Sequence, residues 1–443
     1  MEQVPVVVVG GSLAGMAAAA RLAKAGHRVR LLEGGDRLGG RWAPVAGDEL
    51  PGLVLDAVPG VLTFPAPWRD LFKKSGRALD AELARAGLSM VPGPPAVHRF
   101  SDGTELVLPA ERAAQHAALT GAYGPAVAAR WRDLVDHLLD VWQAMRPLGM
   151  ELELTGPRRL DPRTARLLEP RRTVADLAED VGEPHLAAII RSVASRTGSD
   201  PERTPALVAA ELATLRTFGR WVLQDAEGAP VPSSRLVTLL DARLRLRRVQ
   251  VDLGHQVTAL EITPGVDARV RAVVATRPDG SPERVATDAV ISAVDPWQHL
   301  ALNRRGLRLA DRFRLDRAAP ALAPALTHRL LDRDDSPTAA GGVSEVVQHE
   351  PAGPVVRYRR RVAEGVVLES EHDHTRGRPD PSVGLAWRGW RSVWSRPPIT
   401  TGVGGLWTAG PHSRGGNHLS QVLLSGALAS YGCHDERSGR RGG

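Results

Sequence analysis

The first forty residues constrain the fold more than any other part of the chain. Val6–Val9 is an unbroken β-branched run, which is typical of a strand buried on both faces of a parallel sheet. A glycine-rich turn over 10–15 follows, then a helical pattern over about 14–25 and a second strand over 27–32 that ends at Glu33. A strand, a glycine turn, a helix and a strand, with an acid about twenty residues beyond the glycines, predict a dinucleotide-binding unit.

The residue types in this unit have physical reasons. Gly10 permits the sharp turn off the strand, and Gly15 lets the helix approach the strand closely. The start of the helix offers free N–H groups and a positive dipole end to a diphosphate. Ser12 stands where the usual pattern has its middle glycine, and Glu33 can accept hydrogen bonds from both hydroxyls of an adenosine ribose. The residues expected to bind the dinucleotide here are Gly10, Gly11, Ser12, Leu13, Ala14, Gly15 and Glu33.

The segment after Glu33 distinguishes a flavin-binding site from a nicotinamide-binding site. The run from Gly34 to Trp42, GGDRLGGRW, resembles the extended fingerprint of the flavin amine oxidase and phytoene desaturase superfamily. The resemblance implies that glycines fold beneath the diphosphate of FAD and that an arginine supplies a fork of donors to anionic oxygen. It implies FAD contacts for Gly34, Gly39, Gly40, Arg41 and Trp42.

The resemblance continues in the same order along the chain. Residues 55–60 are similar to the family segment that passes beneath the flavin, and Val257 falls where the family backs its adenine against backbone. Near the C-terminus, the glycines of 404–416 and the small residues of 425–427 resemble the closing element, whose helix points its N-terminus at the pyrimidine end of the ring. The phytoene desaturase branch is the nearer one. These segments add Pro59, Gly60, Val257, Gly410, Gly416 and Asn417 to the expected FAD-binding residues.

The resemblance also implies the fold class and a division of the chain. We expect an α/β protein with a Rossmann-like, discontinuous FAD-binding domain, a second α+β substrate domain and a helix-rich lobe. The FAD-binding parts are 1–95, 225–300 and 395–432, the lobe is 96–224, and the substrate domain is 301–394. Residues 433–443 are polar and are expected to form a disordered tail.

The chemistry is less specific than the cofactor, and the catalytic residue stays unknown. His412 and Arg414 lie in the loop before the last glycines, so they are candidates to shuttle a proton and to anchor a polar group; a purely structural role is the alternative. No third ligand can be named beside His372 and His374, so no metal site is expected. One cysteine, Cys433, excludes a disulfide framework and multi-cysteine metal sites, and fits a reducing, cytoplasmic setting.

The leading hypothesis for function is an FAD-dependent oxidoreductase of the dehydrogenase or desaturase type. It takes a hydride from a largely apolar small molecule, an isoprenoid or another secondary metabolite, and dioxygen or a quinone reoxidises the flavin. Three alternatives stay open: an oxidase of a carbon–nitrogen bond, a non-redox flavin isomerase, and a degenerate flavoprotein without turnover.

Charge and hydropathy restrict the partners. The net charge is +7, but the arginines are spread along the chain, so no nucleic-acid partner is expected. The chain has no uninterrupted run of 18 apolar residues, so no membrane-spanning helix is expected. Trp387, Trp390 and Trp394 follow one another at helical spacing among arginines. They are typical of a core cluster, or alternatively of a substrate channel or a peripheral membrane contact.

Overall fold

Parallel strands from three distant parts of the chain form the central sheet. The computed structural model describes residues 4–47, 52–55, 57–149, 151–153, 160–303, 315, 317–332 and 342–439. The sheet order is β11-β2-β1-β15-β20, and every pairing in it is parallel. The strands are β1 (Val6–Val9), β2 (Val29–Leu32), β11 (Gln250–Asp252), β15 (Val290–Ser292) and β20 (Leu406–Thr408). All four valines of β1 are buried, as expected for a strand covered on both faces.

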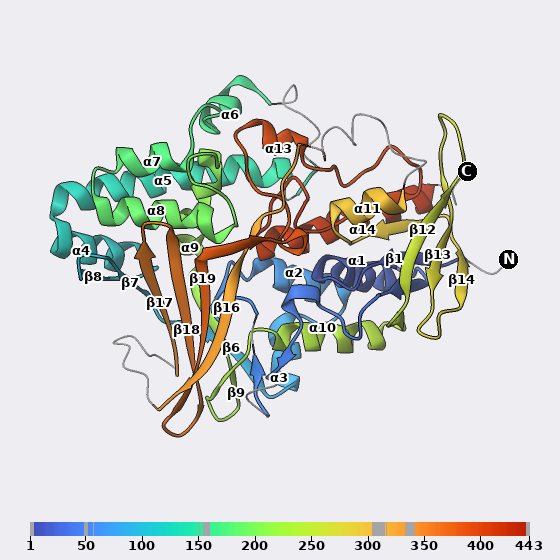
Figure 1. Ribbon diagram of the computed structural model, residues 1–443, viewed down its shortest axis with the longest axis horizontal. Coiled ribbons are helices and arrows are strands. Elements are labelled where there is room, and N and C mark those ends of the chain that lie inside the picture. The colour runs from blue at the N-terminus through green and yellow to red at the C-terminus, as the bar shows by residue number, and fades with distance from the viewer. Residues whose placement is uncertain are drawn as a thin grey trace.

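Helices cover one face of this sheet and an antiparallel sheet covers the other (Figure 1). The helical face has α1 (Leu13–Lys24), α2 (Ala66–Ser75), α3 (Leu79–Arg85), α10 (Arg235–Leu246) and α14 (Leu419–Gly439). A side chain at Gly426 of α14 would overlap the backbone carbonyl of Ala14, so glycine lets α14 lie directly on α1. The opposite face has β12 (Gln256–Ile262), β13 (Val270–Thr276), β14 (Pro282–Ala286) and α11 (Pro296–Leu302).

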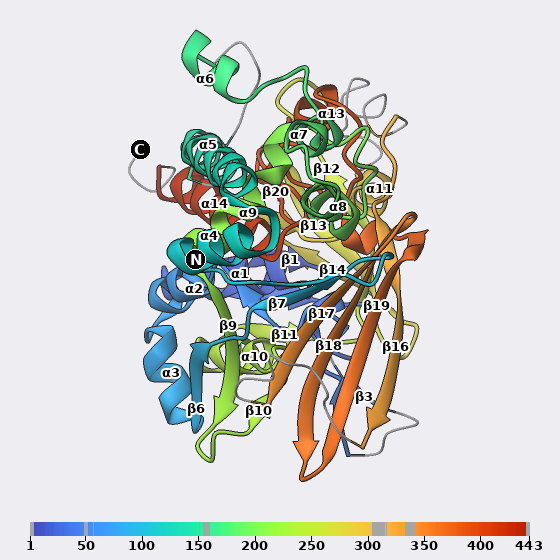
Figure 2. The same cartoon turned by 90° about the vertical axis from the view of Figure 1, so that its left-hand side faces the viewer.

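A second, six-stranded sheet stands beside this unit, with β16 at its outer edge (Figure 2). Its order is β16-β19-β18-β17-β7-β8, and β7 runs parallel to β17. The strands are β7 (Ala96–Arg99), β8 (Glu105–Leu108), β16 (Leu322–Leu331), β17 (Val343–Glu350), β18 (Gly353–Ala363) and β19 (Val366–Pro379). The hairpin of β7 and β8, which the sequence division assigns to the lobe, therefore extends the sheet of residues 322–379.

Short strands and helices complete the structure. The lobe has α4 (Arg112–Tyr123), α5 (Pro125–Gly149), α6 (Pro162–Leu167), α7 (Val174–Asp180), α8 (Pro184–Arg196), η3 (Ala206–Ala210) and α9 (Glu211–Phe218). A small sheet joins β5 (Leu62–Thr63), β6 (Leu88–Pro92), β9 (Arg220–Asp225) and β10 (Pro230–Val231), while β3 (Val45–Ala46) pairs with β4 (Val54–Leu55). The remaining helices are η1 (Gly40–Trp42), η4 (Pro381–Val383) and α13 (Arg391–Ser395).

The expected tail from residue 433 is wrong as far as the structure describes it. Helix α14 continues to Gly439, and residues 440–443 lie outside the described residues. Arg437 is buried, its Nη1 lies 2.5 Å from Asp288 Oδ1, and its Nη2 donates to the Val4 carbonyl at 3.0 Å. The polar residues that suggest disorder in the sequence therefore hold the end of the helix against the central sheet.

Candidate functional site

Of three adjoining cavities, the main one lies at the carboxyl ends of β1, β2 and β15, and the second lies beside the second sheet. The main cavity has a volume of about 350 Å³. The second cavity is about 120 Å³ and shares Arg41, Trp42 and Asn417 with the first. The third is about 60 Å³ and shares Asn417, Glu211 and His418 with the second. The carboxyl ends of parallel strands are where open α/β sheets bind their ligands.

Most of the predicted cofactor-binding residues come together in the main cavity. Those that line it are Gly10, Ser12, Leu13, Glu33, Gly34, Gly39, Gly40, Arg41, Trp42, Val257 and Asn417. Pro59 lines the second cavity and Gly416 the third. Gly11, Ala14, Gly15, Gly60 and Gly410 line none of the three.

The glycine turn after β1 is built by close contacts. Gly10 has a φ of +96°, which favours glycine, and a side chain at Gly15 would overlap the Gly10 carbonyl. Ser12 caps α1 and donates its Oγ–H to the Ala293 carbonyl at 2.9 Å, so its hydroxyl joins the turn to the end of β15. The serine in place of the middle glycine is therefore accommodated, and the start of α1 faces the main cavity.

Glu33 is fixed at one end of the main cavity. Its Oε2 accepts a hydrogen bond from Gly11 N at 2.5 Å, and its Oε1 accepts one from Gly35 N at 2.7 Å. Val257 lines the same end of the cavity. The carboxylate thus ties the glycine turn after β1 to the loop after β2.

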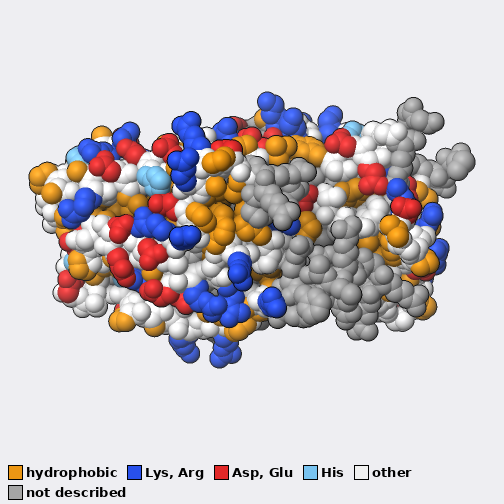
Figure 3. Space-filling view, turned by 90° about the horizontal axis from the view of Figure 1, so that it is seen from above, with side chains coloured by type: hydrophobic (Ala, Val, Ile, Leu, Met, Phe, Trp, Pro, Cys, Tyr) orange, Lys and Arg blue, Asp and Glu red, His pale blue; other side chains and the backbone are white. Residues whose placement is uncertain are grey.

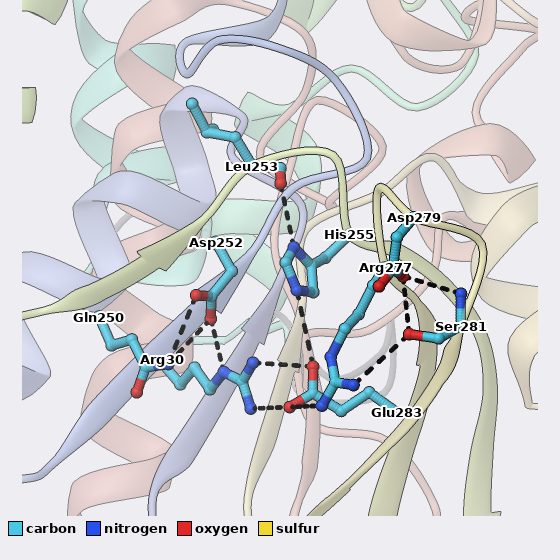
Figure 4. A network of polar contacts seen from close by, with 9 residues as sticks. All are labelled: Arg30, Gln250, Asp252, Leu253, His255, Arg277, Asp279, Ser281 and Glu283. Atoms are coloured by element: carbon cyan, nitrogen blue, oxygen red, sulfur yellow. Dashed lines mark hydrogen bonds and ion pairs between the residues drawn. The ribbon is translucent and has the colours of Figure 1, made fainter.

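A charged network holds the loop that carries Val257 (Figure 4). Arg30 of β2 pairs with Asp252 at 2.5 Å and with Glu283 of β14 at 2.9 Å. The hydrogen bond from Arg30 holds the pKa of Glu283 below its usual value. His255, which also lines the main cavity, lies 3.6 Å from Glu283. The network therefore fixes the 252–257 turn against β2.

Arg41 supplies an available cation where the main and second cavities meet. Burial lowers the pKa of its guanidinium, and the charge of Asp380 opposes that shift. Within the described part of the chain, the Arg41 side chain makes no hydrogen bond or ion pair. A guanidinium in this state suits the anionic oxygens of a diphosphate.

The second and third cavities combine apolar walls with a few charged side chains. Their apolar walls include Val58, Val61, Leu62, Leu322 and Val383 in the second and Phe64, Trp142, Leu207, Val208 and Trp387 in the third. Glu211 Oε1 lies 2.8 Å from His418 Nε2. Burial opposes the charge on both partners, but their mutual attraction prevails: the pKa of Glu211 is lowered and that of His418 is raised.

A second group of charges reaches from the wall of the second cavity, which Arg196 lines, to the buried Glu345. Arg196 donates to the Tyr358 hydroxyl at 3.1 Å and lies 3.4 Å from Glu345, which also pairs with Arg220. Burial lowers the pKa of His372 to about 3 and raises that of Tyr358, so both are neutral at pH 7. Sequence analysis missed Arg196, Glu211 and His418 as site residues. The signal that could have found Glu211 is its place as the one acid within the apolar run ALVAAELATL.

Neither candidate for catalysis lines any of the three cavities described above. The His412 side chain is buried against Gly410, and burial lowers its pKa to about 3. Arg414 Nε donates to the Arg396 carbonyl at 3.3 Å. Arg396 occupies the space inside this loop and the loop turns His412 inward, so the structure gives the two side chains structural contacts, and a catalytic role for them stays a prediction.

Comparison with known proteins identifies the family. A sequence model described as "Flavin containing amine oxidoreductase" matches residues 13–318. The chain belongs to this family. This match confirms the predicted family membership and its flavin cofactor, and the helices and sheets described above confirm the predicted α/β fold. The Glu33 carboxylate, the start of α1 and the Arg41 guanidinium all line the main cavity, and together they are the donor and acceptor set that a dinucleotide requires.

Individual relatives give more detail. The chain is similar to a phytoene dehydrogenase of Streptomyces griseus, with 30% identity over 68% of this chain and 56% of the relative. It is also similar to a hydroxyneurosporene desaturase of Rhodobacter capsulatus, with 29% identity over 60% of this chain and 54% of the relative. The chain thus spans little more than half the length of these relatives. An oxidoreductase structure from Methanosarcina mazei shares the fold, with a TM-score of 0.66, 15% identity and coverage of 95% and 98% of the two chains.

The described residues contain no group of three His, Cys, Asp or Glu side chains placed to hold a metal ion. None of the helices in the described ranges combines the length and the apolar character needed to cross a bilayer.

Proposed function

We propose that this protein is an FAD-dependent dehydrogenase of the desaturase type that acts on a largely apolar small molecule, such as an isoprenoid. The observation that carries the proposal is the pair of cavities beyond Trp42 and Asn417, in which aliphatic and aromatic walls are combined with a carboxylate that is already paired. The names of the two relatives, a phytoene dehydrogenase and a hydroxyneurosporene desaturase, support an isoprenoid.

Named residues would hold the cofactor in an extended arrangement. Glu33 would accept the adenosine ribose hydroxyls, and the start of α1 together with Arg41 would bind the diphosphate. Trp42 and Asn417 would flank the ring at the far end, where the main cavity meets the second. When bound, FAD supplies the acceptor for a hydride from a C–H bond. The chain's own part is to orient the substrate and to exclude water from the junction of the cavities.

The second and third cavities have no strong base in their described walls, which agrees with a reaction in which FAD accepts the hydride and the chain only orients the substrate. His372 stays neutral, and the only carboxylate that lines the second and third cavities, within the described ranges, is Glu211, which is paired with His418. No lysine lines any of the three cavities. Reoxidation by dioxygen or a quinone completes the proposed cycle.

The proposal extends to a peripheral membrane contact. Leu322, Leu326 and Leu330 are exposed on the edge strand β16, and Leu322 also lines the second cavity. Trp387 is buried, so the tryptophan cluster forms part of a core and the apolar edge of β16 is the better contact surface. Co-sedimentation with anionic liposomes at low salt tests the membrane contact, and its loss in Leu326→Glu would place it on β16.

Basic and acidic side chains are interspersed on the face in Figure 3, which supports the absence of a nucleic-acid surface there.

One experiment separates desaturase from amine-oxidase chemistry. The FAD-loaded protein is mixed anaerobically with apolar polyenes or with alkylamines, and the visible flavin absorbance is followed. We expect bleaching by a polyene and none by an amine. Bleaching by amines alone would overturn the proposal.

A further inference from the structure

Arg396 is a buried cation without a carboxylate partner in the described part of the chain. Its side chain is 1% exposed. Nη1 donates to the carbonyls of Pro411 and Ser413 at 3.1 and 3.3 Å, and Nη2 donates to the Leu385 carbonyl at 2.6 Å and to Asn417 Oδ1 at 2.9 Å. All of these acceptors are neutral.

The charge is retained in spite of its burial. Burial lowers the pKa of Arg396 to about 9, so the guanidinium is still protonated at pH 7. Its central carbon lies 3.8 Å from the centre of the Trp387 ring, a cation–π contact that offsets part of the desolvation. The titratable groups whose charges act on this region, His412 and His299, both have pKa values lowered by burial and are neutral at pH 7. An isolated buried charge is expensive, so a counter-charge close by would stabilise it.

The position of Arg396 indicates where that counter-charge arises. Two of its acceptors, Pro411 and Asn417, line the main cavity, and Trp387 lines the third. The guanidinium therefore stands one residue behind the wall, beside Asn417, which lines both the main and the second cavity. If Glu33 holds the adenosine, the part of the cavity at Asn417 receives the flavin ring.

We propose that Arg396 is a positioning residue that acts through Asn417 and the 411–413 loop to stabilise the negative charge of reduced flavin. Reduction by a hydride adds two electrons and one proton, so the neutral oxidised ring becomes an anion unless it takes up a second proton. That anion is the counter-charge that the buried guanidinium lacks. The inference rests on FAD binding and on its orientation, and does not depend on the substrate.

The test measures the reduction potential of bound FAD, with dithionite as reductant and a reference dye at equilibrium. Arg396→Gln removes the charge and keeps amide donors, and Arg396→Lys keeps the charge. The exposed Arg391→Gln is the matched control on the same segment. In Arg396→Gln we expect the equilibrium constant for reduction to fall at least tenfold, which is about 30 mV for a two-electron couple. The lysine variant and the control should stay near the unaltered protein.

An unchanged potential in a folded, FAD-loaded Arg396→Gln, or an equal shift in the control, would overturn the proposal. If the glutamine variant does not fold, a pH titration of the unaltered protein tests the proposal instead. The absorbance of its reduced flavin is followed against pH, and the second proton should bind about one pH unit or more below the pH found for free reduced flavin. Protonation at or above the pH of the free flavin contradicts the proposal. Because dithionite supplies the electrons, either result is independent of which substrate the protein uses.

Discussion

Replacing Glu33 by glutamine tests where the adenosine of FAD lies. The carboxylate accepts hydrogen bonds from Gly11 N and Gly35 N, and it is expected to accept the ribose hydroxyls as well. Glutamine has nearly the same shape but offers one acceptor oxygen instead of two, and no charge. A hydrogen bond to a charged group contributes about 1.5–3 kcal/mol. Since each 1.4 kcal/mol is about tenfold in affinity, the dissociation constant for FAD should rise about 10- to 150-fold.

The assay is titration of the apoprotein with FAD, followed by quenching of flavin fluorescence. Asp36→Asn is the matched control, because Asp36 lies in the same loop, its side chain is 90% exposed, and its ion pair with Arg37 is long, at 3.9 Å. A dissociation constant in Glu33→Gln within about twofold of the unaltered protein, with the fold intact, would refute the orientation. The ring would then have to be sought at the Glu33 end, and the argument about Arg396 would fall with it.

Three further changes test the packing and the charges around the site. Gly426→Ala forces α14 away from Ala14 and should cost about 1–3 kcal/mol of stability in thermal melts, whereas Gly439→Ala, with no atom within 4 Å of the new side chain, should cost little. Glu345→Gln leaves the buried Arg220 and the half-buried Arg196 without their carboxylate and should cost about 3–5 kcal/mol in urea unfolding; a loss below 1 kcal/mol would contradict the network. The raised pKa of His418 means that its ion pair stabilises the fold below about pH 6.5 and is lost as the pH rises through the folded value, so His418→Gln should lower Tm more at pH 6 than at pH 9. Equal losses at the two pH values would exclude the pair as the cause.

Local signals made the cofactor-binding unit predictable. The helix expected over about 14–25 is Leu13–Lys24 in the structure, because a capping Ser12 and a following glycine mark its ends in the sequence itself. The exact domain limits remain predictions.

The features that could not be predicted depend on contacts between segments far apart in the sequence. The sequence of residues 96–108 does not predict that β7 runs parallel to β17, some 250 positions later. Strand pairing depends on the register with the partner strand and not on the local pattern. The same holds for His412: its loop position does not predict that Arg396 occupies the loop interior and that the imidazole is buried. The polar residues after 433 misled for a similar reason, since Arg437 finds its partner on a distant segment.

The charges around the second cavity also bear on the choice between substrates. Glu211 is neutralised by His418, and Glu345 is shared between two arginines, so the described walls carry no free negative charge and a surplus of positive charge. Arg41 adds a further cation at the junction with the main cavity, which a bound diphosphate would offset. A protonated amine entering this space would be repelled and would gain no carboxylate partner, whereas a neutral hydrocarbon loses nothing to the paired charges and gains by burial against Val58, Leu62 and their apolar neighbours. The electrostatics of the cavity thus favour the desaturase proposal independently of the names of the relatives.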